Sequence, residues 1–267
     1  MPANDSKMSK KAVADFTVAA NIRLNNTNFL IKLIAPEPLP KIYPGQFVNI
    51  DIKNAKEIFL RRPFSVFEVN YSQNTLSVIV KILGRGSKVL TEINPGEKLS
   101  LIYPLGKKFS YPAENERILA IGGGSGVAPM LFLAKESGLS ANDVDIILGA
   151  RSASDHIRME EYEKYAHLHY TTEDASLGAE GFVIHHPLFT NELDKYDKIY
   201  ACGPDAMMKA VAREAKKAGV FCEVSLENLM ACGFGVCLCC IEPTTAGNKC
   251  VCTDGPVFNI NELKWQI

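Results

Sequence analysis

Six of the eight cysteines of this 267-residue chain lie close together near its C-terminal end. The stretch CGFGVCLCC, residues 232–240, contains four of them, and Cys250 and Cys252 follow. Clustered cysteines form disulfides, bind zinc or hold an iron–sulfur cluster. The first twelve residues, MPANDSKMSKKA, are polar and lack the apolar segment of a secretory signal, so we expect a cytoplasmic protein. In a reducing compartment clustered cysteines bind metal more often than they form disulfides, which favours a metal site.

The spacing of the first cysteines favours an iron–sulfur cluster over zinc. Cys232, Cys237 and Cys240 form the pattern C-x4-C-x2-C, which is the spacing of plant-type [2Fe–2S] ligands. Gly233 and Gly235 suit a tight loop that turns N–H groups toward the cluster sulfurs. Zinc sites instead use paired C-x2-4-C units, often with histidine, and this part of the sequence contains no histidine. We therefore expect a [2Fe–2S] site, with zinc as the alternative.

The fourth ligand is ambiguous from spacing alone. Cys250 and Cys252 both lie downstream of the C-x4-C-x2-C pattern, and either could complete the set. Cys239 is adjacent to Cys240, and we expect its side chain to point away from the cluster.

Three further stretches contain residue types that bind nucleotide cofactors. Residues 122–129, GGGSGVAP, follow an apolar run, and glycines after a strand let the backbone approach a diphosphate at the next helix. Residues 61–66, RRPFSV, offer an arginine for a phosphate, an aromatic ring for stacking and a hydroxyl for a ring nitrogen. Residues 200–208, YACGPDAMM, are a further strand, glycine turn and helix start.

Each of these stretches also has a purely structural explanation. The glycines after residue 121 could form an ordinary tight turn. RRPFSV could be an edge strand with a surface arginine and a buried Phe64. Cys202 could be a small buried apolar residue. The combination of the three stretches is more informative than any one of them.

Hydrophobic patterning predicts the elements that position these residues. Short strands separated by proline and glycine turns, with no convincing helix in the first hundred residues, predict a small antiparallel barrel. The predicted barrel strands include 29–34, 46–52, 75–82 and 98–106. After residue 117 strands alternate with helices, which predicts a parallel nucleotide-binding sheet. We expect strands there at 118–124, 143–151, 167–172 and 198–203, and helices at 127–138 and 205–219.

Length and charge indicate several modules without a nucleic-acid or membrane function. The length is near the limit for one hydrophobic core, and the patterns divide the chain into a barrel at 1–112, an α/β domain at 113–222 and a cysteine-rich module at 223–267. The 29 Lys and Arg residues nearly balance the 30 Asp and Glu residues, which gives no electrostatic footprint for nucleic acid or an anionic membrane. The longest uncharged run, 118–134, is too short and too rich in glycine to span a bilayer.

The order RPFS, GGGSGVAP and CGP resembles the ferredoxin–NADP reductase-like flavoprotein superfamily over about residues 15–220. The resemblance implies an FAD-binding barrel followed by a pyridine-nucleotide domain. Arg62 would contact the FAD diphosphate, whereas Phe64 and Ser65 would line the isoalloxazine. Phe64 replaces the tyrosine that many relatives carry, which preserves stacking but loses a phenolic hydrogen bond. The other implied positions are Pro63, Ile79, Val80, Lys81, Gly86 and Ser87 for the flavin and its phosphates, Gly122, Gly123, Gly124 and Gly126 for the dinucleotide, and Cys202, Gly203 and Pro204 beside the nicotinamide.

The C-terminal stretch LMACGFGVCLCC…VCTDGPVF is similar to the iron–sulfur module of the electron-transfer subunit of NAD-dependent class IB dihydroorotate dehydrogenases. In that family the last cluster ligand precedes a DGPVF stretch, here residues 254–258, so the resemblance selects Cys252. The complete implied ligand set is Cys232, Cys237, Cys240 and Cys252. This resemblance covers nearly the whole chain except its polar start.

The family resemblance implies a division of labour between two subunits. A partner subunit oxidises dihydroorotate on its own FMN, and electrons pass through the [2Fe–2S] centre and FAD of this chain to NAD⁺. The expected assembly is a heterotetramer with two copies of each subunit. No catalytic residue for dihydroorotate is evident in the sequence, so we expect this chain not to oxidise dihydroorotate alone.

Other readings of the same modules are open. A related flavin and iron–sulfur subunit of a ferredoxin-dependent NADH:NADP transhydrogenase, or of a sulfhydrogenase, would contain the same three parts. A non-enzymatic zinc-binding module is an alternative of another class. For the nicotinamide, the stretch GARSASD offers both Arg151, which suits NADP, and Asp155, which suits NAD, and the family favours NAD.

Overall fold

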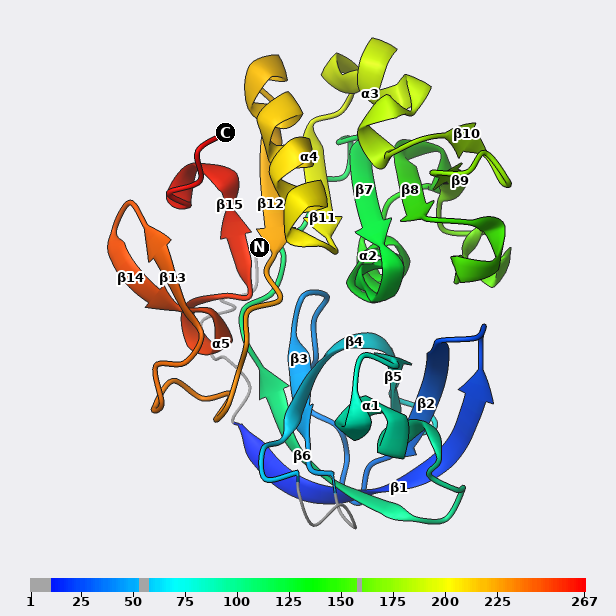
Figure 1. The fold of residues 1–267 in the computed structure, drawn as a ribbon, viewed down its shortest axis with the longest axis vertical. Coiled ribbons are helices and arrows are strands. Elements are labelled where there is room, and N and C mark those ends of the chain that lie inside the picture. Colours follow the sequence, from blue (N-terminus) through cyan, green and yellow to red (C-terminus); the bar gives the residue numbers. More distant parts are fainter. Residues whose placement is uncertain (1–10, 53–57, 158–159) are drawn as a thin grey trace.

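The structure is a computed structural model that describes residues 11–52, 58–157 and 160–267. Most of the polar opening segment, residues 1–10, lies outside the described residues. A barrel occupies one end of the molecule and a parallel sheet occupies the other (Figure 1). The cysteine-rich segment runs alongside both (Figure 1).

The N-terminal part closes into an antiparallel barrel in the order β1-β2-β5-β4-β3-β6. Its strands are β1 (Ala12–Arg23), β2 (Asn28–Ile34), β3 (Phe47–Ile50), β4 (Arg62–Asn70), β5 (Thr75–Lys81) and β6 (Lys98–Leu105). Alternate residues of each strand point inward, and Phe16, Ile31 and Val48 are fully buried in the barrel core. The four strands predicted by their patterns are present, and β1 extends over residues for which no strand was predicted.

The expectation that this part contains no helix is wrong. A helix, α1 (Arg85–Thr91), lies between β5 and β6. Its start is fixed by Ser87, whose hydroxyl oxygen accepts hydrogen bonds from the N–H groups of Leu83 and Gly84 at 2.9 and 3.2 Å. A helix of 7 residues is too short to show helical periodicity in the sequence. Within RRPFSV, residues 62–65 pair with β3 and Val66 pairs with β5, so among the described residues most of the stretch has one paired side, as in the edge-strand alternative, but Phe64 is half-buried rather than buried.

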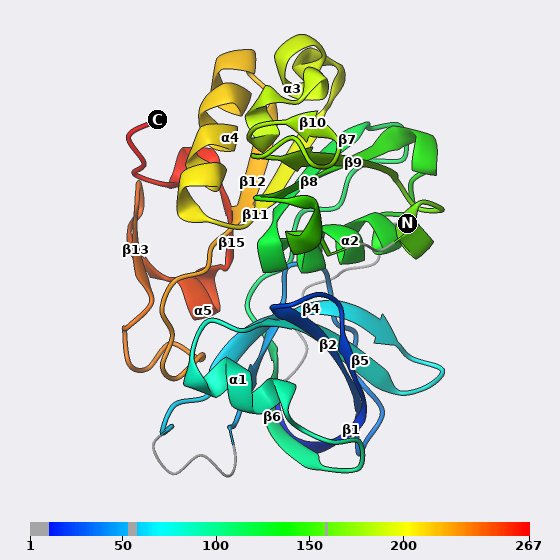
Figure 2. The same ribbon diagram turned by 45° about the vertical axis from the view of Figure 1, so that its right-hand side comes forward.

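The second part is a seven-stranded sheet among the described residues, in the order β10-β9-β8-β7-β11-β12-β15. The parallel strands are β7 (Ile118–Gly123), β8 (Val144–Ala150), β9 (His167–Thr172), β10 (Ala179–Glu180), β11 (Lys198–Cys202) and β12 (Phe221–Ser225). Helix α2 (Val127–Glu136) packs on one face, and α3 (Pro187–Asn191) and α4 (Asp205–Ala218) pack on the other (Figures 1 and 2). As predicted, α4 ends at a glycine, Gly219, whose φ of 71° is left-handed.

The cysteine-rich segment is joined to this sheet by its last strand. A hairpin of β13 (Ile241–Thr244) and β14 (Gly247–Cys250) leads into α5 (Val251–Asp254). Strand β15 (Val257–Asn259) then pairs antiparallel with β12, whose residues include the predicted boundary between 222 and 223. The C-terminal segment therefore completes the edge of the parallel sheet, while the module boundaries themselves stay a prediction.

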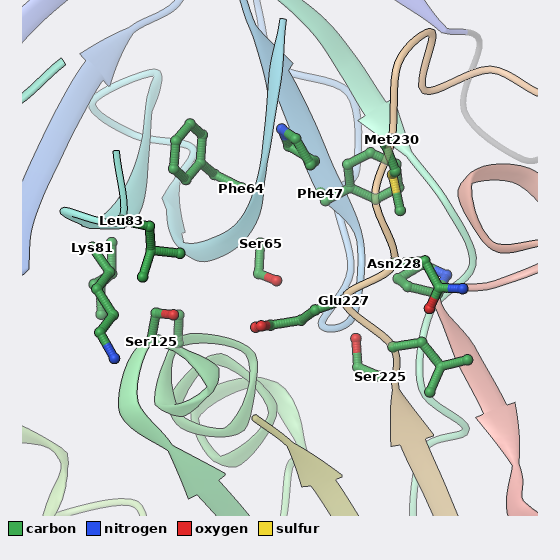
Figure 3. Close-up of a pocket in the computed structure, with 15 residues that line it drawn as sticks. Phe47, Phe64, Ser65, Lys81, Leu83, Ser125, Ser225, Glu227, Asn228 and Met230 are labelled. Carbon is green, nitrogen blue, oxygen red and sulfur yellow. The ribbon is translucent and has the colours of Figure 1, made fainter. Parts of the chain in front are cut away.

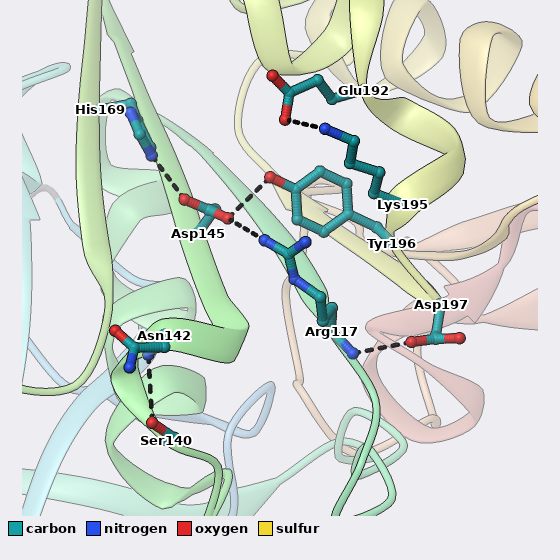
Figure 4. A network of polar contacts seen from close by, with 9 residues as sticks. All are labelled: Arg117, Ser140, Asn142, Asp145, His169, Glu192, Lys195, Tyr196 and Asp197. Carbon is teal, nitrogen blue, oxygen red and sulfur yellow. Dashed lines mark hydrogen bonds and ion pairs between the residues drawn. The ribbon is translucent and has the colours of Figure 1, made fainter.

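A buried carboxylate connects the strands at the end of the sheet opposite the glycine turns. Asp145 accepts hydrogen bonds from His169 Nε2 at 2.7 Å and Tyr196 Oη at 2.8 Å, and it lies 3.7 Å from the Arg117 guanidinium (Figure 4). Burial alone would raise the pKa of Asp145, but the hydrogen bonds from His169 and Tyr196 lower it below its usual range. The network fixes the starts of β7, β8 and β9 to one another. No helix in the described part of the chain is long and apolar enough to cross a membrane.

Candidate functional site

A cleft lies between the barrel and the carboxyl ends of the parallel strands, the edge at which open α/β sheets bind their ligands (Figure 3). Five predicted flavin residues line it: Pro63, Phe64, Ser65, Ile79 and Lys81. They come from the ends of β4 and β5 that lie next to the last paired residues of the two strands, Val66 and Val78. The remaining lining residues were not predicted, and they are Phe47, Leu83, Ser125, Ala128, Ser225, Leu226, Glu227, Asn228, Met230 and Pro256.

Four of the unpredicted residues share a signal that the sequence contained only weakly. Ser225 ends β12 and Leu226 to Asn228 follow it, and the carboxyl end of a parallel strand is where ligands bind. Strand β12 is 5 residues long and was not predicted, so its end could not be used.

The Arg62 side chain lies against the start of α1. A Cβ atom added to Gly86 would come 3.3 Å from Arg62 Nε, so the absence of a side chain at Gly86 makes room for the guanidinium stem. Arg62 Nη1 donates to the carbonyl oxygen of Leu60 at 2.7 Å. Two residues predicted for the flavin phosphates, Arg62 and Gly86, are thus in contact.

Two other predicted residues do not present their side chains to the cleft. Val80 is fully buried in the barrel core. The Ser87 hydroxyl is hydrogen bonded to the backbone at the start of α1. Their predicted part in cofactor binding would therefore rest on their backbone groups or on positioning neighbours.

The predicted glycine turns after β7 and β11 pack directly against each other. A Cβ at Gly126 would come within 2.3 Å of the Cys202 carbonyl oxygen. Gly203 has a φ of 150°, and a Cβ there would lie 3.0 Å from the Gly123 nitrogen. Real Cβ atoms do not approach so closely, so this contact requires glycine. The structure brings together these two stretches, which lie about 80 residues apart in the chain.

The remaining predicted positions of these turns also lie at this contact. A Cβ at Gly122 would come 2.7 Å from Val127 Cα, and one at Gly123 would come 2.9 Å from Pro204 Cδ. Gly124 has a left-handed φ of 58°, and a Cβ there would be 3.4 Å from the Lys81 ammonium nitrogen. The Lys81 side chain, at the end of β5, therefore reaches the glycine turn after β7.

Glu227 adds a carboxyl group to the cleft. Its side chain points between Ser65 and Ser125 (Figure 3). It is accessible from the open cleft, yet protein surrounds it on most sides, and this desolvation raises the pKa of the carboxyl group. The positive charge of Lys81 acts in the opposite direction but does not cancel the effect of burial.

The cysteine loop directs backbone N–H groups at sulfur. The N–H of Phe234 lies 3.5 Å from Cys232 Sγ, and the N–H of Cys252 lies 3.4 Å from Cys240 Sγ. Burial alone would raise the pKa of Cys232, but hydrogen bonds from the N–H groups of Cys237, Phe234 and Val236, together with the Cys237 thiol, lower it to about 6. A lowered pKa favours the thiolate form, which is the form that binds metal.

The four predicted ligands form two pairs. The Cys232 thiol interacts with that of Cys237, and the Cys252 thiol interacts with that of Cys240. Burial and the Cys240 thiol raise the pKa of Cys252 to about 12. Two cysteine pairs match a [2Fe–2S] centre, in which each of two irons takes two thiolates. In residues 11–52, 58–157 and 160–267 no group of three or more His, Cys, Asp or Glu side chains is arranged to hold a single metal ion.

The loop conformation suits a cluster site, and Cys239 and Cys250 are the two cysteines of this segment outside the predicted ligand set. Gly233 and Gly235 have left-handed φ angles of 78° and 89°, as expected for a tight loop. Cys239 is exposed. The N–H of Cys250 donates to Asp254 Oδ2 at 3.0 Å, at the end of β14.

Comparisons with known proteins match all three parts of the chain. A family model described as the iron–sulfur cluster binding domain of dihydroorotate dehydrogenase B matches residues 227–264. Models of an oxidoreductase NAD-binding domain and an oxidoreductase FAD-binding domain match residues 120–213 and 14–111. The dihydroorotate dehydrogenase B (NAD(+)) electron transfer subunit of Fusobacterium nucleatum is 32% identical over 94% of this chain and 98% of its own length. The subunit of that name from Caldanaerobacter subterraneus is 36% identical over 84% of this chain and 87% of its own length.

The chain belongs to the family of dihydroorotate dehydrogenase B electron transfer subunits. This membership confirms the predicted resemblance, and the matched FAD-binding, NAD-binding and iron–sulfur domains confirm the predicted cofactor classes and the three-part fold. The family fold extends to other reductases. A chain from a structure of NADH-dependent reduced ferredoxin-NADP oxidoreductase superposes with a TM-score of 0.82 and 28% identity, covering 97% of this chain and 92% of that one. A ferredoxin reductase of carbazole 1,9a-dioxygenase, with a TM-score of 0.69 and 23% identity, covers 80% of this chain and 68% of its own length and has the same fold.

Proposed function

We propose that this chain carries electrons from a dihydroorotate-oxidising partner subunit to NAD⁺ through a [2Fe–2S] cluster and FAD. The observation that carries the proposal is the continuity of two sites. Glu227, Asn228 and Met230 line the flavin cleft, and the cysteine loop begins two residues later at Cys232. When bound, the cluster exchanges single electrons, the flavin one or two, and the nicotinamide a hydride.

The barrel residues would bind and orient the flavin. We assign the FAD diphosphate to Arg62, whose guanidinium can bond phosphate in two places. Phe64 and Ser65 would take the isoalloxazine, Phe64 by stacking and Ser65 by a hydrogen bond to the ring system. Their position in the cleft beside Lys81 supports this assignment.

The turns after β7 and β11 would bind the nicotinamide dinucleotide. The turn that begins at Gly122 leads through a 3-10 turn, Gly124–Gly126, into α2, and the N-terminus of a helix that follows a glycine turn favours a diphosphate. Cys202 ends β11, and Glu227, which lines the cleft, follows β12. Because its pKa is raised by burial, the Glu227 carboxyl holds a proton over a wider pH range than an exposed glutamate. We assign NAD rather than NADP, with Asp155 as the ribose-binding acid.

The cluster would be held by Cys232, Cys237, Cys240 and Cys252. Their two close pairs and the N–H groups directed at Cys232 and Cys240 support this set. Cys250 is the less suitable fourth ligand, because its backbone is bonded to Asp254 and it takes no part in the two sulfur pairs.

The partner would dock over the cysteine loop. Apolar side chains around the loop are exposed, with 85% of Leu229, 73% of Val236 and 57% of Leu238 accessible. Exposed apolar groups gathered in one place mark protein interaction surfaces. We propose an FMN-containing dihydroorotate dehydrogenase subunit as the occupant, in an assembly of two copies of each subunit.

The test is reconstitution with purified subunits. The isolated chain should contain flavin and iron, oxidise NADH with an artificial acceptor, and fail to reduce NAD⁺ with dihydroorotate. Adding the FMN-containing partner should produce dihydroorotate-dependent NADH formation that neither protein has alone. A colourless protein that contains zinc instead of iron would contradict the proposal, and so would dihydroorotate oxidation by this chain alone.

A second candidate function is favoured by one structural match. The reduced ferredoxin-NADP oxidoreductase chain covers 97% of this chain, so a ferredoxin-linked nicotinamide reductase subunit fits the same fold. The same reconstitution separates the two candidates. Coupling to ferredoxin, together with no coupling to any dihydroorotate-oxidising partner, would favour the second.

A further inference from the structure

A buried asparagine lies on the outer face of the flavin barrel. Asn49 belongs to β3, where Val48 and Ile50 point into the barrel core and Phe47 and Asn49 point outward. Despite facing outward, Asn49 is 0% exposed, because another part of the chain covers it. Buried polar side chains normally bond a specific partner.

That covering part is the cysteine loop. Asn49 Nδ2 donates to the carbonyl oxygen of Cys232 at 3.2 Å, across 183 residues of sequence. A Cβ added to Gly233 would come 2.7 Å from Asn49 Nδ2 and 3.3 Å from Leu105 Cδ1, so the loop backbone lies directly on the barrel. The first predicted ligand of the cluster is therefore attached to a strand of the flavin domain.

The hydrogen bond from Asn49 fixes the peptide that follows Cys232. With its carbonyl oxygen bonded to the barrel, the loop turns through Gly233, whose φ is 78°. The next N–H, that of Phe234, then lies 3.5 Å from Cys232 Sγ. Groups that orient a ligand and donate to its sulfur tune both the affinity and the potential of an iron–sulfur centre.

Strand β3 also contacts the flavin site. Phe47, two residues before Asn49 and on the same face, lines the flavin cleft. The amide oxygen of Asn49 is buried and has no hydrogen-bond partner among the described residues. An unpaired buried acceptor costs free energy that an apolar residue would avoid. Packing alone therefore does not explain an asparagine here, whereas the Nδ2 group of Asn49 has a specific acceptor, the Cys232 carbonyl oxygen of the cysteine loop.

We propose that Asn49 is a positioning residue, which holds the first cluster ligand, Cys232, at a fixed place relative to the flavin cleft. The proposal rests on the proposed function, since it requires that Cys232 bind the cluster. The proposal means that one short strand, β3, contacts both the flavin cleft and the cysteine loop. Phe47 contacts the flavin side, and Asn49 holds the cluster side.

The test compares Asn49→Leu with a matched control, Asn21→Leu. Asn21 has the same pattern, since its Nδ2 donates to the carbonyl oxygens of Thr91 and Ile93 at 3.0 and 2.9 Å and its Oδ1 is buried and unpaired. Its partners belong to the barrel region and not to the cysteine loop. Leucine has the branching and the number of side-chain heavy atoms of asparagine, and it removes both the Nδ2 donor and the unpaired amide oxygen.

Three readouts are measured on the purified flavin- and iron-containing proteins. They are the electron paramagnetic resonance spectrum and midpoint potential of the cluster, the rate at which the cluster is reduced after the flavin is reduced by NADH, and amide hydrogen exchange of residues 230–236. In Asn49→Leu we expect a shifted spectrum and potential, reduction of the cluster slowed by about tenfold, and faster exchange in the loop. Asn21→Leu should match the parent in all three.

The outcomes separate this inference from the proposed function. If the parent has a cluster that NADH reduces, and Asn49→Leu equals the parent in spectrum, rate and exchange, Asn49 does not position the loop. Equal changes in Asn21→Leu would also overturn the inference, because they would reflect general weakening of the barrel.

If Asn49→Leu fails to retain iron, hydrogen exchange is compared with that of iron-depleted parent protein. Faster exchange confined to the loop then supports the inference, and unchanged exchange overturns it. A parent without a cluster would instead contradict the proposed function.

Discussion

The sulfur of Cys202 lies 3.9 Å from a carboxylate oxygen of Glu227. Cys202 ends β11 and Glu227 follows β12, so the contact joins the carboxyl ends of two neighbouring parallel strands. Burial, reinforced by the Glu227 charge, raises the pKa of Cys202 well above its usual range. The thiol therefore stays neutral, and Glu227 is the member of the pair that changes charge first as the pH rises.

Replacing Glu227 by glutamine should alter how the bound flavin responds to pH. As the pH rises through the raised pKa, the carboxyl group ionises, and its negative charge then opposes the addition of electrons to a flavin in the cleft. We expect parent and Glu227→Gln to have similar flavin midpoint potentials at low pH. The parent should fall below the variant at high pH, measured by spectroelectrochemical titration between about pH 5 and pH 9.

The control for this prediction is Glu223→Gln. The pKa of Glu223 is also raised by burial, but its carboxylate bonds Ser110, away from the cleft. The control should follow the parent curve. A constant offset between Glu227→Gln and the parent at every pH would show that Glu227 does not titrate near the flavin.

Single cysteine-to-serine substitutions should identify the cluster ligands. Cys237→Ser and Cys252→Ser should lose most of the cluster absorbance and paramagnetic signal, because a serine hydroxyl is a poor replacement for a thiolate. The same holds for Cys232→Ser and Cys240→Ser. Cys250→Ser serves as the control, because it lies two residues from Cys252 and should keep a normal signal, as should Cys239→Ser. A normal spectrum in Cys252→Ser with a lost spectrum in Cys250→Ser would reverse the assignment of the fourth ligand.

Arg62→Ala should weaken FAD binding while the cluster is retained. Loss of a charge-assisted hydrogen bond to the diphosphate should reduce affinity by about 10- to 100-fold, measured by flavin fluorescence titration. Arg61→Ala is the neighbouring control, because its guanidinium donates to the Ser100 carbonyl oxygen at 2.6 Å, within the barrel. Equal FAD affinity in Arg62→Ala and the parent would show that the diphosphate lies elsewhere.

The Asp145 network should make folding stability sensitive to acid. The folded-state pKa of Asp145 is lowered, so its contribution to stability is present above its unfolded pKa of about 4 and is lost as the pH falls through the folded value. Asp145→Asn should lower the free energy of unfolding at neutral pH by about 1–3 kcal/mol. The difference should shrink toward low pH in urea unfolding curves.

A surface carboxylate of the same region provides the control for Asp145. Asp197 is exposed and accepts a hydrogen bond from the Arg117 backbone N–H at 2.8 Å. Asp197→Asn should cost less stability at neutral pH than Asp145→Asn. If the two variants lose equal stability with equal pH dependence, the buried network is not the source of the acid sensitivity.

The sequence by itself determined the features that depend on neighbours in the chain. Alternation predicted the barrel strands, the Gly219 stop ended α4 where expected, and the order of the RPFS, GGGSGVAP and CGP motifs indicated the fold. These signals are local, because periodicity and turn propensity act over a few residues. The family resemblance followed from the same short motifs and from the cysteine spacing.

Only the tertiary structure decided the contacts between distant segments. It placed Glu227 in the cleft between the barrel and the parallel sheet, added β15 to the edge of that sheet and set Asn49 against Cys232 across 183 residues. It also revealed α1, whose 7 residues are held by the cap at Ser87 and by packing against the barrel. Such contacts leave no periodic trace in the sequence, because each depends on how closed strands and crossing loops bring remote residues together.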